Sequence, residues 1–192
     1  MNIVPDNHPE LFPWVLVTMS AISVQCWLIP IFVGRVRGRA FNKEFMQQFE
    51  KEHKEAFPND ETPPLGYPDM GNGYFSKRLS YAEWFHFNNA QRVHYNFLES
   101  LPFVLILLFI AGLKQPLAAL ILGIVYFVSR LLYFIGYIKN PTFRMIGGLP
   151  AGLVVITLFG LSLYTVSEIM KMYNAASSIN QSLSTVSPPL KI

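Results

Sequence analysis

The chain has 192 residues, of which 52% are hydrophobic and only 14% are charged, and its formal net charge is +3. Soluble domains carry about 25% charged residues. The composition, with a mean hydropathy of +0.32, therefore indicates an integral membrane protein. The small net charge, and the lack of a basic run with interleaved aromatic residues, argue against a nucleic-acid partner. The single cysteine, Cys26, can form no disulfide within the chain.

Four apolar segments are long enough to cross a bilayer, which takes roughly 20 residues. The predicted spans are 14–34, 88–113, 117–138 and 147–168. They predict an all-α membrane protein, a bundle of four transmembrane helices that occupies 14–170. A polar lead-in over 1–13 precedes the bundle, and a polar tail over 171–192 is expected to fray.

The first connection, 35–87, is much longer than the other two. Phenylalanines recur every four residues over 41–49, which predicts a short amphipathic helix on the membrane surface. Residues 61–73 are rich in proline and glycine and are expected to be loop. Arginine and lysine gather at the first and third connections, so the positive-inside rule places both in the cytosol.

Polar residues come directly before the apolar block of the second span. Asn89, Arg92, Asn96 and Glu99 recur at helical spacing and so share one face of a helix. Because an arginine and a glutamate are costly at membrane depth, we expect this face to be a functional site that points at protein or at a water-filled cavity. The alternative is a structural ion pair between helices.

The third span repeats this feature. Four of its residues share one helix face: Tyr126, Arg130, Tyr133 and Tyr137. This face, Arg144 and the arginines of the first and second spans converge on one side of the membrane. Since arginine binds carboxylates bidentately, such a pocket would suit a small zwitterionic ligand with several carboxylates, such as a peptide. An interfacial belt of tyrosines is the alternative, but a belt does not account for the single face.

Two blocks of the sequence resemble one family, the membrane-associated proteins in eicosanoid and glutathione metabolism (MAPEG). The first block, Arg92-Val-His94-Tyr-Asn96-Phe-Leu-Glu99-Ser-Leu-Pro102, is similar to the family signature Arg-x-x-x-Asn-x-x-Glu-x-x-Pro. The second block keeps the family spacing of the tyrosines and arginines between Tyr126 and Arg144. The first block looks most like microsomal glutathione transferases.

The resemblance implies a homotrimer of four-helix protomers, with glutathione bound as co-substrate between neighbouring subunits near the cytosolic face. It implies no metal. Arg144 would stabilise the glutathione thiolate. The residues that the resemblance assigns to glutathione binding are Arg37, Arg92, His94, Asn96, Glu99, Arg130, Tyr133 and Tyr137. Around Arg37 the alignment is loose, and Arg35 is the other arginine that matches.

The substrate implied by the resemblance is a hydrophobic electrophile or lipid that enters from the bilayer. The endoplasmic reticulum is the implied compartment, with a mitochondrial membrane as the alternative. Two features depart from the family. Ser100 replaces an aromatic residue of the leukotriene-forming members, which disfavours a leukotriene substrate. The first connection is longer than in the family, so residues 40–86 are a candidate docking site for a further protein.

Three functions follow from these patterns. The first is a glutathione transferase or glutathione-dependent peroxidase, and the second is a non-catalytic member of the same fold that binds lipid or serves a larger membrane complex. The third is an unrelated transporter or scaffold, which the lack of an internal repeat disfavours. The presence of Tyr133, Tyr137 and Arg144 favours the enzyme.

Overall fold

The computed structural model of the chain describes residues 8–186, and this part of the chain contains only helices and loops. The four long helices are α1 (Phe12–Ala40), α4 (Tyr81–Gly112), α5 (Pro116–Lys139) and α6 (Arg144–Val186). The short helices are η1 (Pro9–Leu11), α2 (Lys43–Gln47), α3 (Glu50–Ala56), η2 (Pro64–Gly66), η3 (Ser76–Arg78) and η4 (Pro141–Phe143). By length and composition, four helical segments can cross a membrane, which confirms the all-α, four-span prediction.

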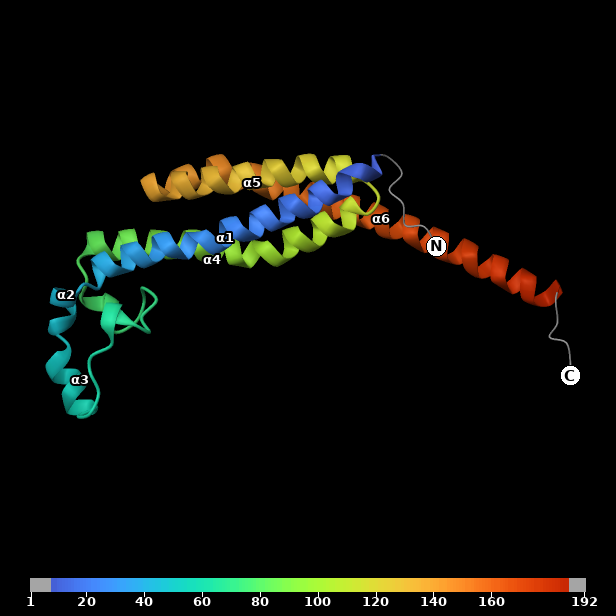
Figure 1. Cartoon of the computed structure of the whole chain (residues 1–192). Helices are drawn as coiled ribbons and strands as arrows, with labels where there is room; N and C mark the ends of the chain where they lie inside the picture. The colour runs from blue at the N-terminus through green and yellow to red at the C-terminus, as the bar shows by residue number, and fades with distance from the viewer. Residues whose placement is uncertain (1–7, 187–192) are drawn as a thin grey trace, which may run out of the picture.

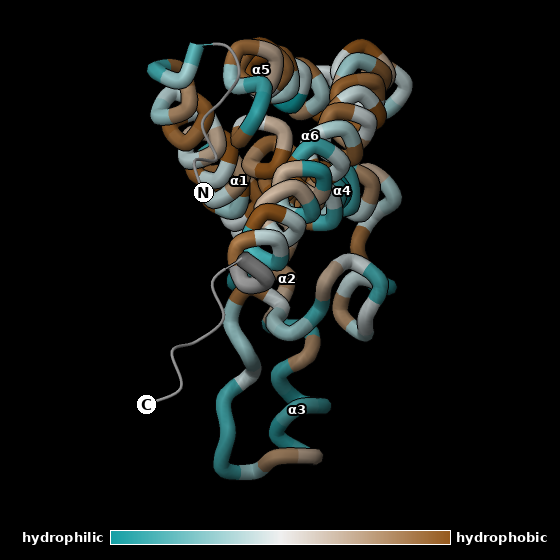
Figure 2. Tube along the Cα trace, turned by 90° about the vertical axis from the view of Figure 1, so that its right-hand side faces the viewer, coloured by the Kyte–Doolittle hydropathy of each residue, from teal (hydrophilic) through white to brown (hydrophobic). Residues whose placement is uncertain are grey.

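The long helices pack side by side as a bundle with two different ends (Figure 1). The turn between α4 and α5 and the start of α1 lie at one end. At the other end lies the compact segment formed by residues 41–80, which we call the cap. Figure 2 shows hydrophobic stretches along the bundle and a hydrophilic α3 in the cap. The bundle core consists of small and branched side chains, among them Val15, Ile22, Val104, Leu108, Ala119 and Leu158.

Helix α4 begins at Tyr81, seven residues before the predicted start at residue 88. A capping box fixes this start: the Ser80 hydroxyl accepts a hydrogen bond from the Glu83 amide, and the Glu83 carboxylate accepts one from the Ser80 amide at 3.2 Å. Two of the amides that a helix start leaves unpaired are thereby satisfied. The aromatic residues expected in a connection therefore form the first two turns of a helix.

The cap has a small core of its own, which the sequence analysis did not foresee. Phe41 and Phe49 are fully buried there and pack against Phe75 and Phe87, with ring centroids 4.8–5.1 Å apart. Residues 41–57 form two short helices rather than one. The interpretation of their phenylalanines as a membrane-surface face is wrong, because the buried rings face other side chains of the protein.

Helix α6 continues to Val186, well beyond the predicted fourth span. Its 43 residues correspond to roughly 65 Å of helix, about twice the thickness of the hydrocarbon core. The expectation of a fraying tail from residue 171 is therefore wrong up to residue 186, and residues 187–192 lie outside the described part. Figure 1 shows the last turns projecting past the end of the bundle.

Helices α5 and α6 approach each other most closely at Gly147. A Cβ at this position would fall onto the Ser129 carbonyl oxygen and the Tyr133 amide nitrogen of α5. Only a glycine therefore permits this backbone contact. Gly136 is a second such point, where a Cβ would lie 2.6 Å from the Phe143 carbonyl oxygen. These contacts position Tyr133 relative to the start of α6.

We predict that Gly147→Ala separates α5 from α6 and lowers stability by about 1–3 kcal/mol, the usual cost of an overpacked contact. Thermal unfolding of the detergent-solubilised protein would measure the change. Gly152→Ala, in the same helix, is the matched control, because a Cβ there meets nothing within 4 Å. Equal stability of the two variants would contradict the close approach.

Candidate functional site

Three polar side chains of the first sequence block lie exposed on α4. Arg92, Asn96 and Glu99, which we call the α4 stripe, share one face of the helix. Among residues 8–186, none of the three side chains has a hydrogen-bond or ion-pair partner. A charge at membrane depth is costly when it faces lipid. Residues 8–186 therefore leave the α4 stripe uncovered.

Asn89 was predicted to belong to the same stripe, but the structure places it elsewhere. Its side chain is only 8% exposed and lines a pocket of about 420 Å³ between the ends of α1, α4 and α5. The other lining residues are Phe32, Val36, Arg39, Ala40, Glu83, His86 and Ile138. Near its start, α4 is flanked by α1 and α5, so a residue on nearly the same face as Asn96 becomes enclosed.

The face predicted on α5 lies against the bundle. Tyr126, Arg130 and Tyr133 are buried and Tyr137 is half-buried. The rings of Tyr133 and Tyr137 are 5.5 Å apart, and the Arg144 guanidinium lies 5.7 Å from the Tyr137 ring centroid. Arg144 is exposed at the first residue of α6, so the two tyrosines and this arginine form a row that leads from buried Tyr133 to the end of the bundle.

Arg130 is a buried cation, 5% exposed, held by aromatic rings. Its guanidinium lies 4.3 Å from the Phe97 ring centroid and 4.7 Å from that of Tyr133. Such contacts contribute about 2 kcal/mol or more when they are desolvated. Its Nε atom has no hydrogen-bond partner within the described residues. Arg130 thus keeps its positive charge uncompensated beside Tyr133.

Arg37 serves the cap in this structure. It is 2% exposed, and it donates hydrogen bonds to the Leu65 carbonyl at 3.2 Å and to the Met70 sulfur at 3.3 Å. Its guanidinium also lies 4.2 Å from the Tyr67 ring centroid. These contacts use two of the five N–H donors of the guanidinium, and its burial leaves no access for a carboxylate ligand from solvent. Arg35, which is exposed, is the accessible arginine of the pair.

His94 is half-buried, and its ring stacks on Tyr95 with centroids 6.2 Å apart. On the bundle side of α4, Ser100 forms a hydrogen bond of 2.9 Å with the Tyr126 hydroxyl. No hydrogen bond or ring contact within residues 8–186 joins the α4 stripe to Tyr133, Tyr137 or Arg144. Glu99 nevertheless lies within electrostatic range of Tyr133. The predicted site residues therefore gather in one half of the bundle as two groups.

The cap is fastened to α4 by residues that the sequence analysis missed. Trp84 Nε1 and Asn88 Nδ2 donate to the Gly71 carbonyl at 2.9 and 3.0 Å. Gly71 has a φ of +105°, and a Cβ there would lie 2.9 Å from the Asn88 amide, so the close approach needs a glycine. Their spacing of four residues places Trp84 and Asn88 on one helix face, which was the available signal.

Asp69 organises the turn that presents Gly71. Its carboxylate accepts hydrogen bonds from the amides of Gly71, Gly73 and Ser76 at 2.8, 2.9 and 2.7 Å. Burial alone would raise the pKa of Asp69, but the three amide donors outweigh it and hold the pKa below its usual value. The motif Asp-x-Gly-x-Gly was visible in the sequence, within a stretch predicted only as loop.

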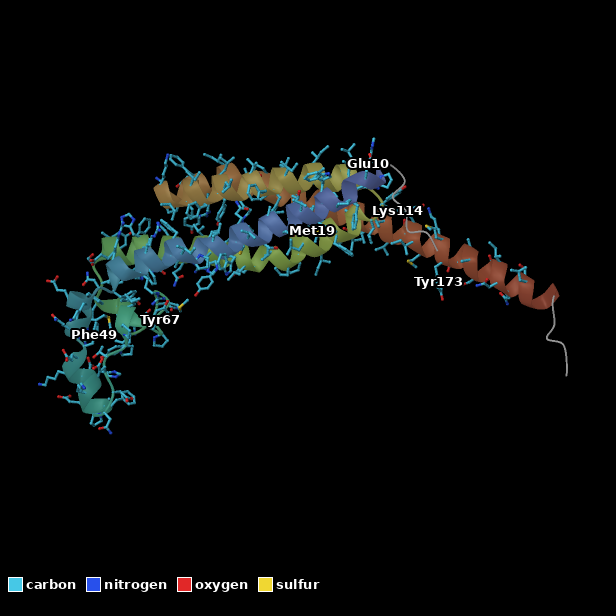
Figure 3. All side chains as sticks on the ribbon, in the orientation of Figure 1. Glu10, Met19, Phe49, Tyr67, Lys114 and Tyr173 are labelled. Atoms are coloured by element: carbon cyan, nitrogen blue, oxygen red, sulfur yellow. The ribbon has the colours of Figure 1, made fainter. Side chains whose placement is uncertain are left out.

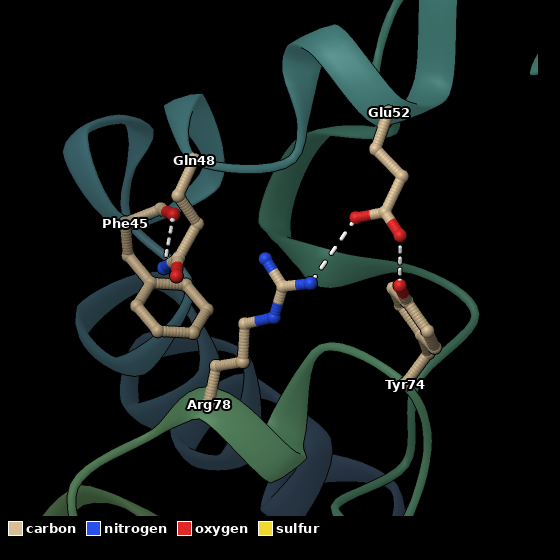
Figure 4. A network of polar contacts seen from close by, with 5 residues as sticks. All are labelled: Phe45, Gln48, Glu52, Tyr74 and Arg78. Atoms are coloured by element: carbon tan, nitrogen blue, oxygen red, sulfur yellow. Dashed lines mark hydrogen bonds and ion pairs between the residues drawn. The ribbon is translucent and has the colours of Figure 1, made fainter. Parts of the chain in front are cut away.

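The outer part of the cap has a polar network on its surface (Figure 4). Arg78 pairs with Glu52 at 3.2 Å, Tyr74 donates a hydrogen bond to the same carboxylate, and the Arg78 guanidinium lies 4.6 Å from the Phe49 ring centroid. Exposed ion pairs contribute little, typically about 0–1 kcal/mol. Figure 3 shows Phe49 and Tyr67 within the cap, away from the labelled residues of the bundle. The buried rings and Asp69 therefore stabilise the cap more than this network does.

The fold and this arrangement define a class, the four-helix integral membrane proteins with an arginine- and tyrosine-rich half. The model of the MAPEG family matches residues 15–164 of the chain. The chain therefore belongs to the MAPEG family. No curated protein matches the sequence.

We predict that Asp69→Asn loosens the cap, because an amide oxygen replaces a charged acceptor and each such hydrogen bond contributes about 1.5–3 kcal/mol. Limited digestion with trypsin would report this as several-fold faster cleavage after Lys77 and Arg78. Asp60→Asn is the control, because the Asp60 side chain is exposed and forms no hydrogen bond within the described residues.

The stability of the cap has a defined pH dependence. Because the folded pKa of Asp69 is lowered, its contribution is complete above the unfolded value, about 3.9, and is lost as the pH falls through the folded pKa. Digestion with pepsin, which is active in acid, should show the wild type approaching the Asp69→Asn variant only there. Equal cleavage of the Asp69→Asn and Asp60→Asn variants at neutral pH would disprove the role of Asp69.

Proposed function

We propose that the protein is a glutathione transferase or glutathione-dependent peroxidase that acts on lipophilic electrophiles at the interface between copies of a homotrimer. The observation that carries the proposal is the α4 stripe, which lies exposed on a helix that can span the membrane and has no hydrogen-bond or ion-pair partner among residues 8–186. A neighbouring copy would cover this face from lipid. Glutathione would bind between the two copies. Its carboxylates and its ammonium group would match the arginine, the amide and the glutamate of the α4 stripe.

The roles follow from the chemistry of each group. Arg92 would bind a glutathione carboxylate, Glu99 would bind the ammonium, and Asn96 would bind an amide. Tyr133 and Tyr137 would donate hydroxyl hydrogen bonds from the other side, with the charge of Arg130 behind them. His94 would contact the ligand from α4. Among the arginines of α1, accessibility favours Arg35 over Arg37 as the remaining contact.

Arg144 is the proposed catalytic residue. A free thiol has a pKa of about 8.5 and is mostly protonated at neutral pH, and a guanidinium beside the sulfur favours the nucleophilic thiolate. Arg144 is also the first residue of α6, where the partial positive charge of the helix N-terminus adds to its own. The thiolate would attack an electrophilic carbon and form a C–S bond as the leaving group departs or an epoxide C–O bond opens. In the peroxidase reaction it would attack a hydroperoxide oxygen and break the O–O bond, which releases the alcohol. The glutathione sulfenic acid so formed would react with a second glutathione to give the disulfide and water.

A second candidate is a non-catalytic member of the family that binds lipid or serves a larger complex. The cap favours it, since a folded unit with its own core offers a surface for another protein. Exposed aromatic side chains on that surface include Tyr67 and Tyr74. The endoplasmic reticulum membrane is the proposed location for either function, and a mitochondrial membrane is the alternative.

We predict that titration of the purified protein with glutathione produces a saturable thiolate band in the ultraviolet difference spectrum at neutral pH. Arg144→Ala should abolish this band, or shift it to a pH near the free thiol pKa of about 8.5, while the oligomer stays intact. Arg39→Ala is the control, because Arg39 is another exposed arginine at the same end of the bundle.

Two results would count against this function. If the wild-type protein shows neither a band nor saturable glutathione binding, the non-catalytic candidate replaces the enzyme. If Arg144→Ala dissociates the oligomer, as judged by size-exclusion chromatography with light scattering, Arg144 has a structural role and the proposed thiolate contact is withdrawn.

A further inference from the structure

One face of α6 stays continuous from inside the bundle to its projecting end. Inside the bundle its residues are all buried: Ala151, Val154, Leu158, Ser162 and Thr165. Past the bundle the face continues through Ile169, Met172, Ala176, Ile179 and Leu183. We call these five residues the seam. From Ser162 to Leu183 the spacing alternates between three and four residues, which is the heptad pattern of helices that pack against helices.

At its far end the seam is not covered by any other part of residues 8–186. Ile179 is 59% exposed and Leu183 is 62% exposed. Figure 1 shows the projecting end of α6 leaning away from α5, beyond the ends of the other three helices. Because α6 is about twice as long as the hydrocarbon core is thick, this end lies outside the lipid. Apolar side chains in water gain free energy when they are buried against another surface.

The charges of the projecting end narrow the choice of partner. Residues 167–183 contain one acid and one base, Glu168 and Lys171, and these pair with each other at 2.7 Å. The helix therefore lacks the basic face that holds a helix on an anionic membrane surface. Its one acid and one base are paired within the helix, so two identical copies in register meet no unpaired like charges. The same segment of a second copy, with its seam in register, fits this uncharged pattern.

We propose that the projecting ends of α6 from neighbouring copies of the chain pair in parallel as a short coiled coil through the seam. Copies inserted in one membrane with the same orientation project these ends on the same side, so the pairing is parallel and brings identical residues together. The neighbouring copy is the one that the proposed function places against the α4 stripe, so the inference rests on that proposal. The pairing extends that contact outside the lipid, and it does not depend on glutathione.

Cysteine cross-linking of the full chain in lipid nanodiscs tests this pairing. Ile179→Cys places a thiol in the seam, and Ser177→Cys places one on the opposite face of the same turn; both are made in a Cys26→Ala background. A disulfide requires Cα atoms within roughly 7 Å, which parallel seams provide only at residue 179. Mild oxidation should therefore cross-link most Ile179→Cys chains, several-fold more than Ser177→Cys chains.

Each outcome decides the proposal. Preferential cross-linking at residue 179, seen as a covalent dimer on a non-reducing gel, supports the parallel seam. Equal cross-linking at both positions would show random encounters and overturn it. No cross-linking at either position would also overturn it and would leave the seam to a lipid or to a different protein. The cross-linking yields at residues 177 and 179 are interpreted in the same way whether or not the variants bind glutathione. A glutathione titration of the same variants therefore tests the proposed function separately.

Discussion

The cost of a charge in hydrocarbon, about 2.5–3.5 kcal/mol for an arginine or aspartate on insertion scales, governs this structure. Past the end of the first span, Arg37 is buried beneath the cap, where a carbonyl, a sulfur and aromatic rings offset the loss of water around the guanidinium. Arg130 meets the cost between the rings of Phe97 and Tyr133. The α4 stripe has no such surroundings in the described chain. This difference between covered and uncovered charges, more than any cavity, is the basis on which we propose that copies of the chain assemble.

The helical bundle and its polar faces could be predicted because they depend on local pattern. An apolar run of about 20 residues predicts a span wherever it occurs. A spacing of three and four residues places side chains such as Tyr126 and Tyr133 on one face whatever the helix packs against. The family signature on α4 is local in the same sense. What such patterns leave open is the direction in which each face points.

The remaining features depend on contacts between distant residues. The cap forms because residues 65–71 meet α1 and α4, and no periodicity of the segment encodes that meeting. Asn89 is enclosed only because α1 and α5 flank the start of α4. The early start of α4 is a different case, since the capping box from Ser80 to Glu83 is local and was overlooked among aromatic residues. Similarly, serine-rich composition concealed the seam that continues along α6.

The cap is bonded to two transmembrane helices at once, through Arg37 on α1 and through Trp84 and Asn88 on α4. These helix ends cannot move apart unless the bonds break. The pocket of about 420 Å³ is bounded by the same two ends, so its width is fixed by a segment that forms little of its wall. Loosening the cap would therefore let the ends of α1 and α4 separate and would widen the pocket between them. In this way the cap controls the width of a pocket that it does not line.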